Sequence, residues 1–412
     1  MKIGRYIGAF PLASFVLFAF HTSSVEAQSN FKVTIDGDYY FEAGLVDHDR
    51  NAGYRNTEFR NRLRLNFRPS GMADNGLEYG ARLRIRANST ARTIDEDMSY
   101  IYVSGSFGTL QLGNTYNYNN LYYASAPIDY RVLGIPDPVQ SFVTTSGSPY
   151  GNHVDSLYSG GINSLDAIYL LTSLSGTKAF YMTPKFGGVH FGVQYTPNNG
   201  SANTDVARMS SVAAAQVQSR FIDIWEVGGY YDGKIADVNL RLSGAYTWGR
   251  AADGITATGN RYEDLKAYQI GARATYRGFT LGGGYVSFGK SGQSKARYMT
   301  AASAAGTPTD AVTAAPTFGG TSEIWNLGVQ YQTGPLMVGT MVSRGKDPGA
   351  LSVRGNRTLD IYTLGAMYTV APGFRVGAEW DHFNAKSDLV DPTGAKRDDK
   401  GNLLLLRSVL VF

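Results

Sequence analysis

The chain has 412 residues, of which 43% are hydrophobic and only 17% charged, with 49 Gly, 28 Tyr and no Cys. The length suggests two or three soluble domains, but the excess of Gly and Tyr favours many strands and turns over helices. The formal charge of +4 is too small to indicate nucleic acid as the main partner, and without Cys the chain has no disulfides, thiolate metal sites or cysteine nucleophiles.

The N-terminus has the pattern of a secretory signal peptide. Lys2 and Arg5 precede an apolar run over residues 7–20, and Val25-Glu26-Ala27 provides a small-residue cleavage pattern. The alternative is a membrane anchor, but the run is too short to span a bilayer as a helix and Pro11 interrupts it. We therefore expect residues 1–27 to be cleaved and residues 28–412 to remain.

The rest of the chain is organised by a period of two. In residues 31–45 the odd positions are mostly apolar and the even positions mostly polar, and residues 57–68 and 77–87 repeat this pattern. Such alternation predicts strands with one apolar and one wet face. Sixteen strands are expected: 31–45, 57–68, 77–87, 97–105, 108–114, 177–184, 188–197, 222–232, 235–249, 265–277, 279–289, 322–333, 335–344, 359–370, 373–384 and 402–412.

The connections between these strands alternate between short and long. Short turns fall at 69–76, 105–107, 184–187, 232–234, 277–278, 333–335 and 371–373. Long polar loops fall at 46–56, 88–96, 115–176, 198–221, 250–264, 290–321, 345–358 and 385–401. This predicts an all-β fold, a 16-stranded antiparallel transmembrane β-barrel with short periplasmic turns and long outer loops.

A soluble sandwich is the alternative fold. Its strands also alternate, but its apolar faces point to a core and its loops are not segregated by length. Here the apolar faces end in aromatic residues, which fits the two interfacial girdles of a membrane barrel. Residues expected in the girdles include Tyr230, Trp248, Trp325 and Trp380. The barrel is the preferred interpretation.

The chain resembles the general diffusion porins of Gram-negative bacteria, especially the alphaproteobacterial type. The segments that carry the resemblance are 104–114 (Ser-Gly-Ser-Phe-Gly-Thr-Leu-Gln-Leu-Gly-Asn), 181–188 (Tyr-Met-Thr-Pro-Lys-Phe-Gly-Gly), 191–195 (Phe-Gly-Val-Gln-Tyr), 364–373 (Leu-Gly-Ala-Met-Tyr-Thr-Val-Ala-Pro-Gly) and the terminal Phe412. The family often has Arg where Asn114 stands. The resemblance implies a homotrimer in outer-membrane lipid and lipopolysaccharide, with each water-filled pore narrowed by an infolded third loop.

The expected third loop, 115–176, is far longer than ordinary connections, which points to a functional role. A barrel of about 16 strands encloses an aqueous channel rather than a packed core. We therefore expect residues 28–412 to form one barrel with a constriction loop over 115–176. The length of the loop makes room for an inward fold, and the resemblance implies that fold.

Arginines gather on the wet faces of the second and third expected strands. If the turn between them centres near residue 73, Arg62 lies opposite Arg84 and Arg64 opposite Arg82. Like charges directly opposite destabilise a sheet, so these side chains need compensation. The predicted basic wall of the constriction, called here the arginine face, consists of Arg60, Arg62, Arg64, Arg82, Arg84 and Arg86.

Acidic residues of the third loop are the expected partners of the arginine face. The candidates are Asp129, Asp137 and Asp155. A basic wall facing acidic groups across a water path creates a transverse field, and charged rings give pores their ion selectivity. Signs are mixed elsewhere on the wet faces, so the sequence predicts only a weak anion preference. The alternative is that these arginines form a solvated outer face.

Two other features of the loops suggest binding. Tyr116, Tyr118, Tyr122 and Tyr123 could form a track for sugar rings, or they could pack the loop against the barrel wall. The acidic triad Asp95-Glu96-Asp97 could bind a divalent cation, latch on a neighbouring subunit or simply be solvated. No resident metal and no cofactor are predicted.

Catalytic motifs are missing from the sequence. It has five His and contains no Gly-x-Ser-x-Gly, His-Glu-x-x-His or phosphate-loop pattern, so an enzyme is not expected. The predicted function is an outer-membrane porin that forms a water-filled channel for passive diffusion of small hydrophilic solutes and ions. The alternative function is a solute-specific, sugar-type porin with a tyrosine-lined constriction.

Overall fold

The computed structural model describes most of the chain from residue 31 onward. The described residues are 31–50, 53–87, 95–131, 138–143, 176–199, 211–212, 221–254, 262–293, 297–299, 313–315, 319–348, 355–388 and 398–412. The predicted signal peptide, 1–27, lies outside them, as do the predicted site residues Asp137 and Asp155.

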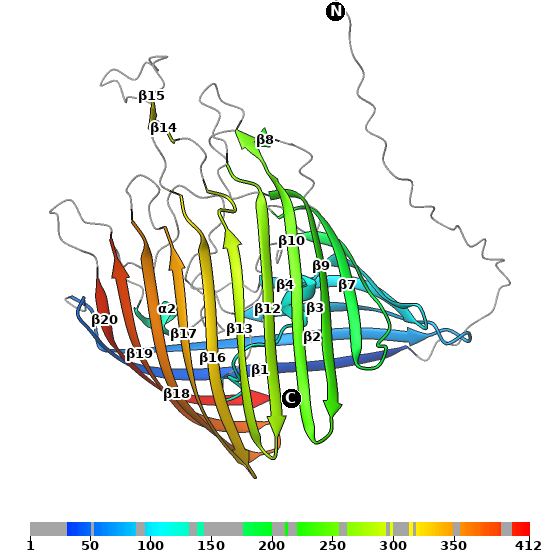
Figure 1. The fold of residues 1–412 in the computed structure, drawn as a ribbon. Coiled ribbons are helices and arrows are strands. Elements are labelled where there is room, and N and C mark those ends of the chain that lie inside the picture. The colour runs from blue at the N-terminus through cyan, green and yellow to red at the C-terminus, as the bar shows by residue number, and fades with distance from the viewer. Residues whose placement is uncertain are drawn as a thin grey trace, which may run out of the picture.

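Sixteen strands form one closed barrel (Figure 1). In order around the ring they are β1 (Lys32–His48), β2 (Thr57–Met72), β3 (Glu78–Ala87), β4 (Asp95–Gly105), β5 (Gly108–Asn114), β6 (Thr177–Met182), β7 (Val189–Asn198), β9 (Phe221–Ile235), β10 (Val238–Ala251), β12 (Leu265–Tyr276), β13 (Phe279–Gly289), β16 (Ser322–Thr333), β17 (Leu336–Asp347), β18 (Arg357–Ala371), β19 (Phe374–Ser387) and β20 (Asp399–Val411).

The predicted fold class is confirmed. Each expected strand is present, neighbours in sequence pair antiparallel, and β20 pairs with β1 to close the ring, with Asp38 opposite Val411 and His48 opposite Gly401. Closure leaves no exposed sheet edge. Two short strand pairs that the sequence pattern did not predict lie outside the barrel: β8 (Ser211–Val212) with β11 (Asp253–Gly254), and β14 (Arg297–Met299) with β15 (Thr313–Ala315).

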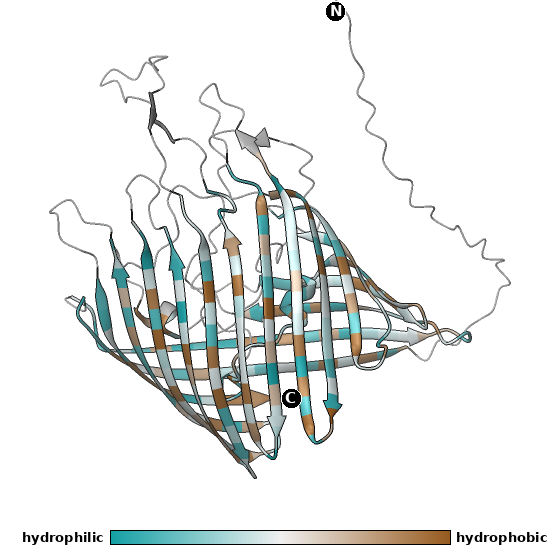
Figure 2. Cartoon of the chain, in the orientation of Figure 1, coloured by the Kyte–Doolittle hydropathy of each residue, from teal (hydrophilic) through white to brown (hydrophobic). Residues whose placement is uncertain are grey.

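The two faces of the barrel are inverted relative to a soluble protein. On β1 the apolar Val33, Ile35 and Leu45 are exposed, whereas Glu42 is fully buried inside. Hydrophilic and hydrophobic residues alternate along the strands in Figure 2. Exposed large apolar side chains occur on strands all round the ring, so the outer surface suits hydrocarbon. The inner wall carries the buried polar and charged groups together with apolar clusters.

Tight hairpins join the strands at one end of the barrel, called here the short-turn end. Arg277 and Gly278 connect β12 to β13 with φ values of 46° and 86°, as the two central residues of a type I′ turn require. Between β2 and β3, Ala73 donates to the carbonyl of Leu77 and Gly76 donates to the carbonyl of Ala73.

The predicted register of β2 against β3 is wrong. Strand β2 continues through Pro69 to Met72, so the turn lies two residues later than expected. Arg64 therefore lies opposite Arg86, and Arg84 lies opposite Asn66 rather than opposite Arg62. Proline without an N–H usually ends or interrupts a strand, which is why the pattern placed the turn too early.

Two short helices follow β5 in the chain, α1 (Tyr118–Leu121) and α2 (Pro138–Val143). Among the described residues, no helix is long and apolar enough to cross a membrane. Helix α2 packs on apolar residues of β1 and β20: Val139 and Val143 are buried in a cluster with Val46, Leu403 and Leu405.

Candidate functional site

Residues 115–131, called here the inner segment, lie along the inner wall of the barrel. Their main-chain N–H groups donate to inward-facing side chains of β7, β9, β10 and β16. The bonds are Tyr118 N to Gln194 Oε1 (3.0 Å), Asn119 N to Glu226 Oε1 (2.8 Å), Ala124 N to Ser243 Oγ (2.9 Å), Ala126 N to Asn326 Oδ1 (3.0 Å) and Asp129 N to Gln330 Oε1 (3.0 Å). An irregular segment needs such partners because its buried N–H groups lack a strand ladder.

The first anchor of the inner segment is Glu226 on β9, which is fully buried. Besides the Asn119 N–H, its carboxylate accepts hydrogen bonds from Asn117 Nδ2 at 2.8 Å and Thr247 Oγ1 at 2.7 Å. Lys178 on β6 donates to the carbonyl of Thr115. These bonds hold the start of the inner segment against β6, β9 and β10.

Glycines in the wall make room for the inner segment. A Cβ at Gly271 would lie 1.8 Å from the Ala124 carbonyl oxygen, and one at Gly192 would lie 2.0 Å from the Tyr118 ring. A Cβ at Gly365 would lie 2.3 Å from the Tyr130 ring. Part of the glycine excess in the composition therefore serves close approach of the inner segment to the wall.

The last anchor is Arg131, which is buried among carboxylates of β19. Its Nη2 lies 2.5 Å from Glu379 Oε1 and 3.1 Å from Asp381 Oδ1. Arg407 on β20 links Glu379 to Glu42 on β1, at 3.2 Å and 2.5 Å. A buried ion network of this kind fixes geometry, because removing one partner leaves an uncompensated charge.

The arginine face lies on the inner wall at β2 and β3, where three of its members, Arg62, Arg64 and Arg84, are buried. Arg62 pairs with Asp38 at 2.9 Å, Arg84 pairs with Asp97 at 2.7 Å, and Arg60 pairs with Glu42. Arg82 donates to Asn66 Oδ1 at 2.7 Å. Within the described part of the chain, the carboxylates that pair with these arginines belong to the neighbouring strands β1 and β4.

Of the three loop carboxylates predicted to face the arginine face, only Asp129 is among the described residues, and its contacts differ from that prediction. Asp129 pairs instead with Arg273 on β12 at 3.2 Å and accepts from Gln330 Nε2. Asp137 and Asp155 fall outside the described residues. The strand carboxylates were not predicted as partners of these arginines, because alternation along one strand does not give its register against the next.

A β-bulge explains the position of Asp97. Strand β3 pairs Arg84 with Met98 and Ile85 with Glu96, so Asp97 is the extra residue of β4. A bulge re-aims a side chain. The Asp97 carboxylate accordingly lies 3.5 Å from Arg64 and 3.4 Å from Arg86, as well as against Arg84. No signal in the sequence marks this irregularity.

The rest of the acidic triad is also engaged. Asp95 lies 3.5 Å from Arg86, and the Glu96 carboxylate accepts from Asn114 Nδ2 at 3.3 Å. Within the described part of the chain, no group of three His, Cys, Asp or Glu side chains is arranged to hold a metal ion. Asp95 and Asp97 thus pair with arginines of β3, and Glu96 accepts a hydrogen bond from Asn114.

The tyrosines of the inner segment pack against the wall. Tyr118 is fully buried and its hydroxyl lies 3.1 Å from His190 Nδ1, while the Tyr122 ring stacks edge-on against His190 with centroids 4.5 Å apart. The Arg84 guanidinium lies over the Tyr116 ring. Burial raises the pKa of the Tyr118 phenol, which keeps it neutral. Tyr116, Tyr118 and Tyr122 thus contact residues of the wall, while Tyr122 also borders a hollow of about 420 Å³.

Tyr230 was expected in the outer aromatic girdle, and that expectation is wrong. Its ring contacts Tyr122 and His190 inside the barrel, with centroids 5.9 and 5.5 Å apart. The residue has the same parity on β9 as the inward-facing Glu226 and Asp232. An aromatic side chain alone does not indicate the lipid face.

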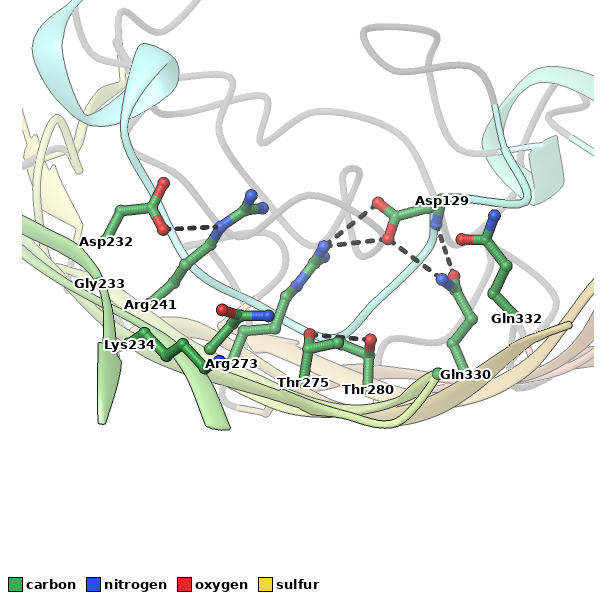
Figure 3. A pocket seen from close by; sticks show the side chains of 12 residues that line it. Asp129, Asp232, Gly233, Lys234, Arg241, Arg273, Thr275, Thr280, Gln330 and Gln332 are labelled. Atoms are coloured by element: carbon green, nitrogen blue, oxygen red, sulfur yellow. Dashed lines mark hydrogen bonds and ion pairs between the residues drawn. The ribbon is translucent and has the colours of Figure 1, made fainter. Parts of the chain in front are cut away.

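Three hollows bordered by described residues lie inside the barrel near the short-turn end. The largest, of about 530 Å³, lies beneath Asp129 and is bordered by β9, β10, β12, β13 and β16 (Figure 3). The others, of about 420 and 260 Å³, are bordered by strands from β4 to β9 and by strands from β2 to β5. Polar, water-accessible spaces inside a closed barrel with an apolar exterior define a membrane-embedded channel protein.

Comparison with known proteins gives the family. The model of the Gram-negative porins matches residues 13–388, and the chain belongs to this family. It is 24% identical over 465 residues to an uncharacterized protein of Rickettsia conorii, with 97% of each chain covered. It is 23% identical over 445 residues to an uncharacterized protein of Rickettsia prowazekii, with 95% of each covered.

Solved structures share the fold. A double mutant of Rhodopseudomonas blastica porin superposes with a TM-score of 0.52 at 15% identity, covering 92% of this chain and 100% of that one. Another solved porin gives a TM-score of 0.50 at 17% identity with the same coverage. The predicted family is confirmed: the protein is an integral outer-membrane porin that forms a channel, and the sugar-specific alternative is not favoured.

Proposed function

We propose that the channel passes small hydrophilic solutes and ions by passive diffusion, and that its narrowest level lies between the arginine face and the inner segment. The observation that carries this proposal is the series of bonds that holds residues 115–131 to the wall. In the closed ring of sixteen strands, β2 stands eight places from β12, so the arginine face lies across the lumen from Arg273 and Asp129.

The proposed constriction loop is the whole of 115–176. The inner segment and α2 support it, since together they contact the wall from β6 round to β1. Single-channel conductance in the presence of polyethylene glycols of graded size would give the exclusion limit. Glycols much larger than a hexose that still enter and lower the conductance would contradict a constriction at this level.

A weak anion preference follows from the balance of the arginine face. Each carboxylate of β1 and β4 offsets guanidinium charge locally, but Arg82 is held by the neutral Asn66. A modest positive excess attracts anions without excluding cations. The reversal potential under a KCl gradient in planar bilayers should indicate chloride preference, and clear potassium selectivity would contradict the proposal.

The remaining proposals concern processing, assembly and chemistry. We expect cleavage after Ala27, which N-terminal sequencing of outer-membrane protein would detect as Gln28. We expect a homotrimer in contact with outer-membrane lipid and lipopolysaccharide, which cross-linking in membranes would test. The protein is proposed to have no enzymatic activity, and esterase or protease turnover that co-purifies with the folded barrel would contradict this.

A further inference from the structure

The largest hollow carries a group of cations that the passage of solutes does not by itself explain. Arg241 on β10 and Arg273 on β12 are directly opposite each other in the register, and both point inward. Figure 3 shows the two guanidinium groups rising side by side from neighbouring strands into the space beneath Asp129. Like charges directly opposite are unfavourable unless an anion compensates them.

The two arginines differ in how they are engaged. Arg273 contacts Asp129 at 3.2 Å and donates to the carbonyls of Ser125 and Ala126, so it holds the inner segment. The Nε of Arg241 lies 3.6 Å from Asp232 Oδ1, which is long for a hydrogen bond, and the two side chains are 49% and 40% exposed. The guanidinium of Arg241 therefore faces the hollow with most of its hydrogen-bonding surface toward water.

A third cation lies at the edge of the same hollow. Lys234, near the end of β9, has its Nζ 3.8 Å from Asp237 and is 60% exposed. The lining itself holds these three cations and two carboxylates, Asp129 and Asp232, and Asp237 approaches Lys234 from outside the lining. The contacts of Arg241 and Lys234 with their carboxylates are long, at 3.6 and 3.8 Å, so both cations keep hydrogen-bonding capacity for a solute. The other lining side chains are neutral hydrogen-bonding groups: Asn239, Thr275, Thr280, Gln330 and Gln332.

We propose that this hollow is a binding subsite for small phosphate-bearing solutes on their way through the pore, with Arg241 and Lys234 as the binding groups and Arg273 as a fixed positive charge. A guanidinium fork and an ammonium group can bind several oxygens of one phosphate at once. Neutral amides and hydroxyls would contact the rest of the solute. The volume of about 530 Å³ is in the range of small-molecule sites.

The proposal rests on the proposed pore function, and the test separates the two. Channels are reconstituted in planar bilayers at about 0.1 M KCl, where charges are screened over about 10 Å. Inorganic phosphate is added to the side that the short turns face. The wild-type chloride current should fall as phosphate is added, and this inhibition should saturate.

Arg241→Gln and Lys234→Gln should each raise the half-saturating phosphate concentration about tenfold. Arg241→Lys should raise it less, because lysine keeps the charge but lacks the guanidinium fork.

The matched control is Arg375→Gln. Arg375 lies on β19 near the same end, has the parity of the inward-facing Glu379 and Asp381, and lines none of the three hollows described. The substitution Arg375→Gln removes one positive charge from the lumen, as Arg241→Gln does, but at a position outside the hollow. It should therefore leave the half-saturating phosphate concentration unchanged. Wild-type current that shows no saturable phosphate effect would overturn the subsite, as would an equal effect of Arg375→Gln. Absence of any KCl conductance in the wild type would instead overturn the pore itself.

Discussion

At the scale of single residues, glycines and one arginine decide where the inner segment lies. The glycines leave space at the wall where the inner segment passes. At the end of the segment, Arg131 forms ion pairs with carboxylates of β19. Both kinds of residue fix the path of the inner segment and so the shape of the lumen.

Replacing Gly271 by Ala should push the inner segment toward the pore axis. The added Cβ would lie 1.8 Å from the Ala124 carbonyl oxygen, so main chain has to move. We expect a lower single-channel conductance. We also expect the free energy of unfolding to fall by about 1–3 kcal/mol, which a lower unfolding temperature of the barrel would reveal. In the control Gly244→Ala, the nearest atom to the new Cβ lies 3.9 Å away, and no change is expected. Equal conductance in the two variants would contradict the role of Gly271.

Replacing Arg131 by Gln should loosen the end of the inner segment. Glu379 and Asp381 would lose a buried guanidinium partner, a change that costs about 3–5 kcal/mol in comparable networks. We expect a folded barrel with a noisier single-channel current. Arg55→Gln is the control, because Arg55 forms an exposed pair with Glu58. If the current noise of Arg131→Gln equals that of the control, the inner segment is held in place without Arg131.

At the scale of elements, the pairing of β1, β2, β3 and β4 sets the charge of the arginine face. Strand β1 brings Asp36, Asp38 and Glu42 beside the arginines of β2, and the bulge in β4 turns Asp97 toward those of β3. The field inside the lumen thus depends on register and on one irregularity, which the sum of charges in the sequence does not specify.

Replacing Asp97 by Asn should strengthen the anion preference. The change removes a carboxylate that lies within 3.5 Å of Arg64 and closer to Arg84, so the positive excess of the arginine face grows. The reversal potential under a KCl gradient should shift further toward that of chloride. Glu58→Gln removes one negative charge at the exposed end of β2 and should shift it much less. A shift toward potassium in Asp97→Asn would contradict the assignment.

At the scale of the whole molecule, the barrel places its apolar residues outside and its charges inside. Opposite charges on the inner wall lie close together, so their net field extends only a short way into the water. The weak selectivity proposed for the channel is a property of this closed arrangement rather than of any single group.

The selectivity should therefore fall with ionic strength. Between about 0.1 M and about 1 M KCl the screening length decreases from about 10 Å to about 3 Å. We expect the ratio of chloride to potassium permeability, obtained from reversal potentials, to approach that of free solution at the higher concentration. A ratio independent of salt would point to exclusion by direct contact at the constriction instead of a screened field.

The sequence alone specified the strands, their order and the inversion of their faces. Period-two alternation is a local property: each strand carries its lipid face and its lumen face in its own residues, as β1 does with Ile35 and Asp36. The alternation of short and long connections then follows from where the strands end. For this reason the class of fold and the family could be predicted before any coordinates.

Only the tertiary structure decided which charged groups meet. The partners of Arg84 and Arg131 lie on other strands, and their pairing depends on a bulge in β4 and on the path of the inner segment. Register is set by turn geometry, and a shift of two residues in one hairpin was enough to misplace Arg62 relative to Arg84. Contacts between distant residues arise from ring closure and from the wall that the inner segment follows, which no local pattern encodes.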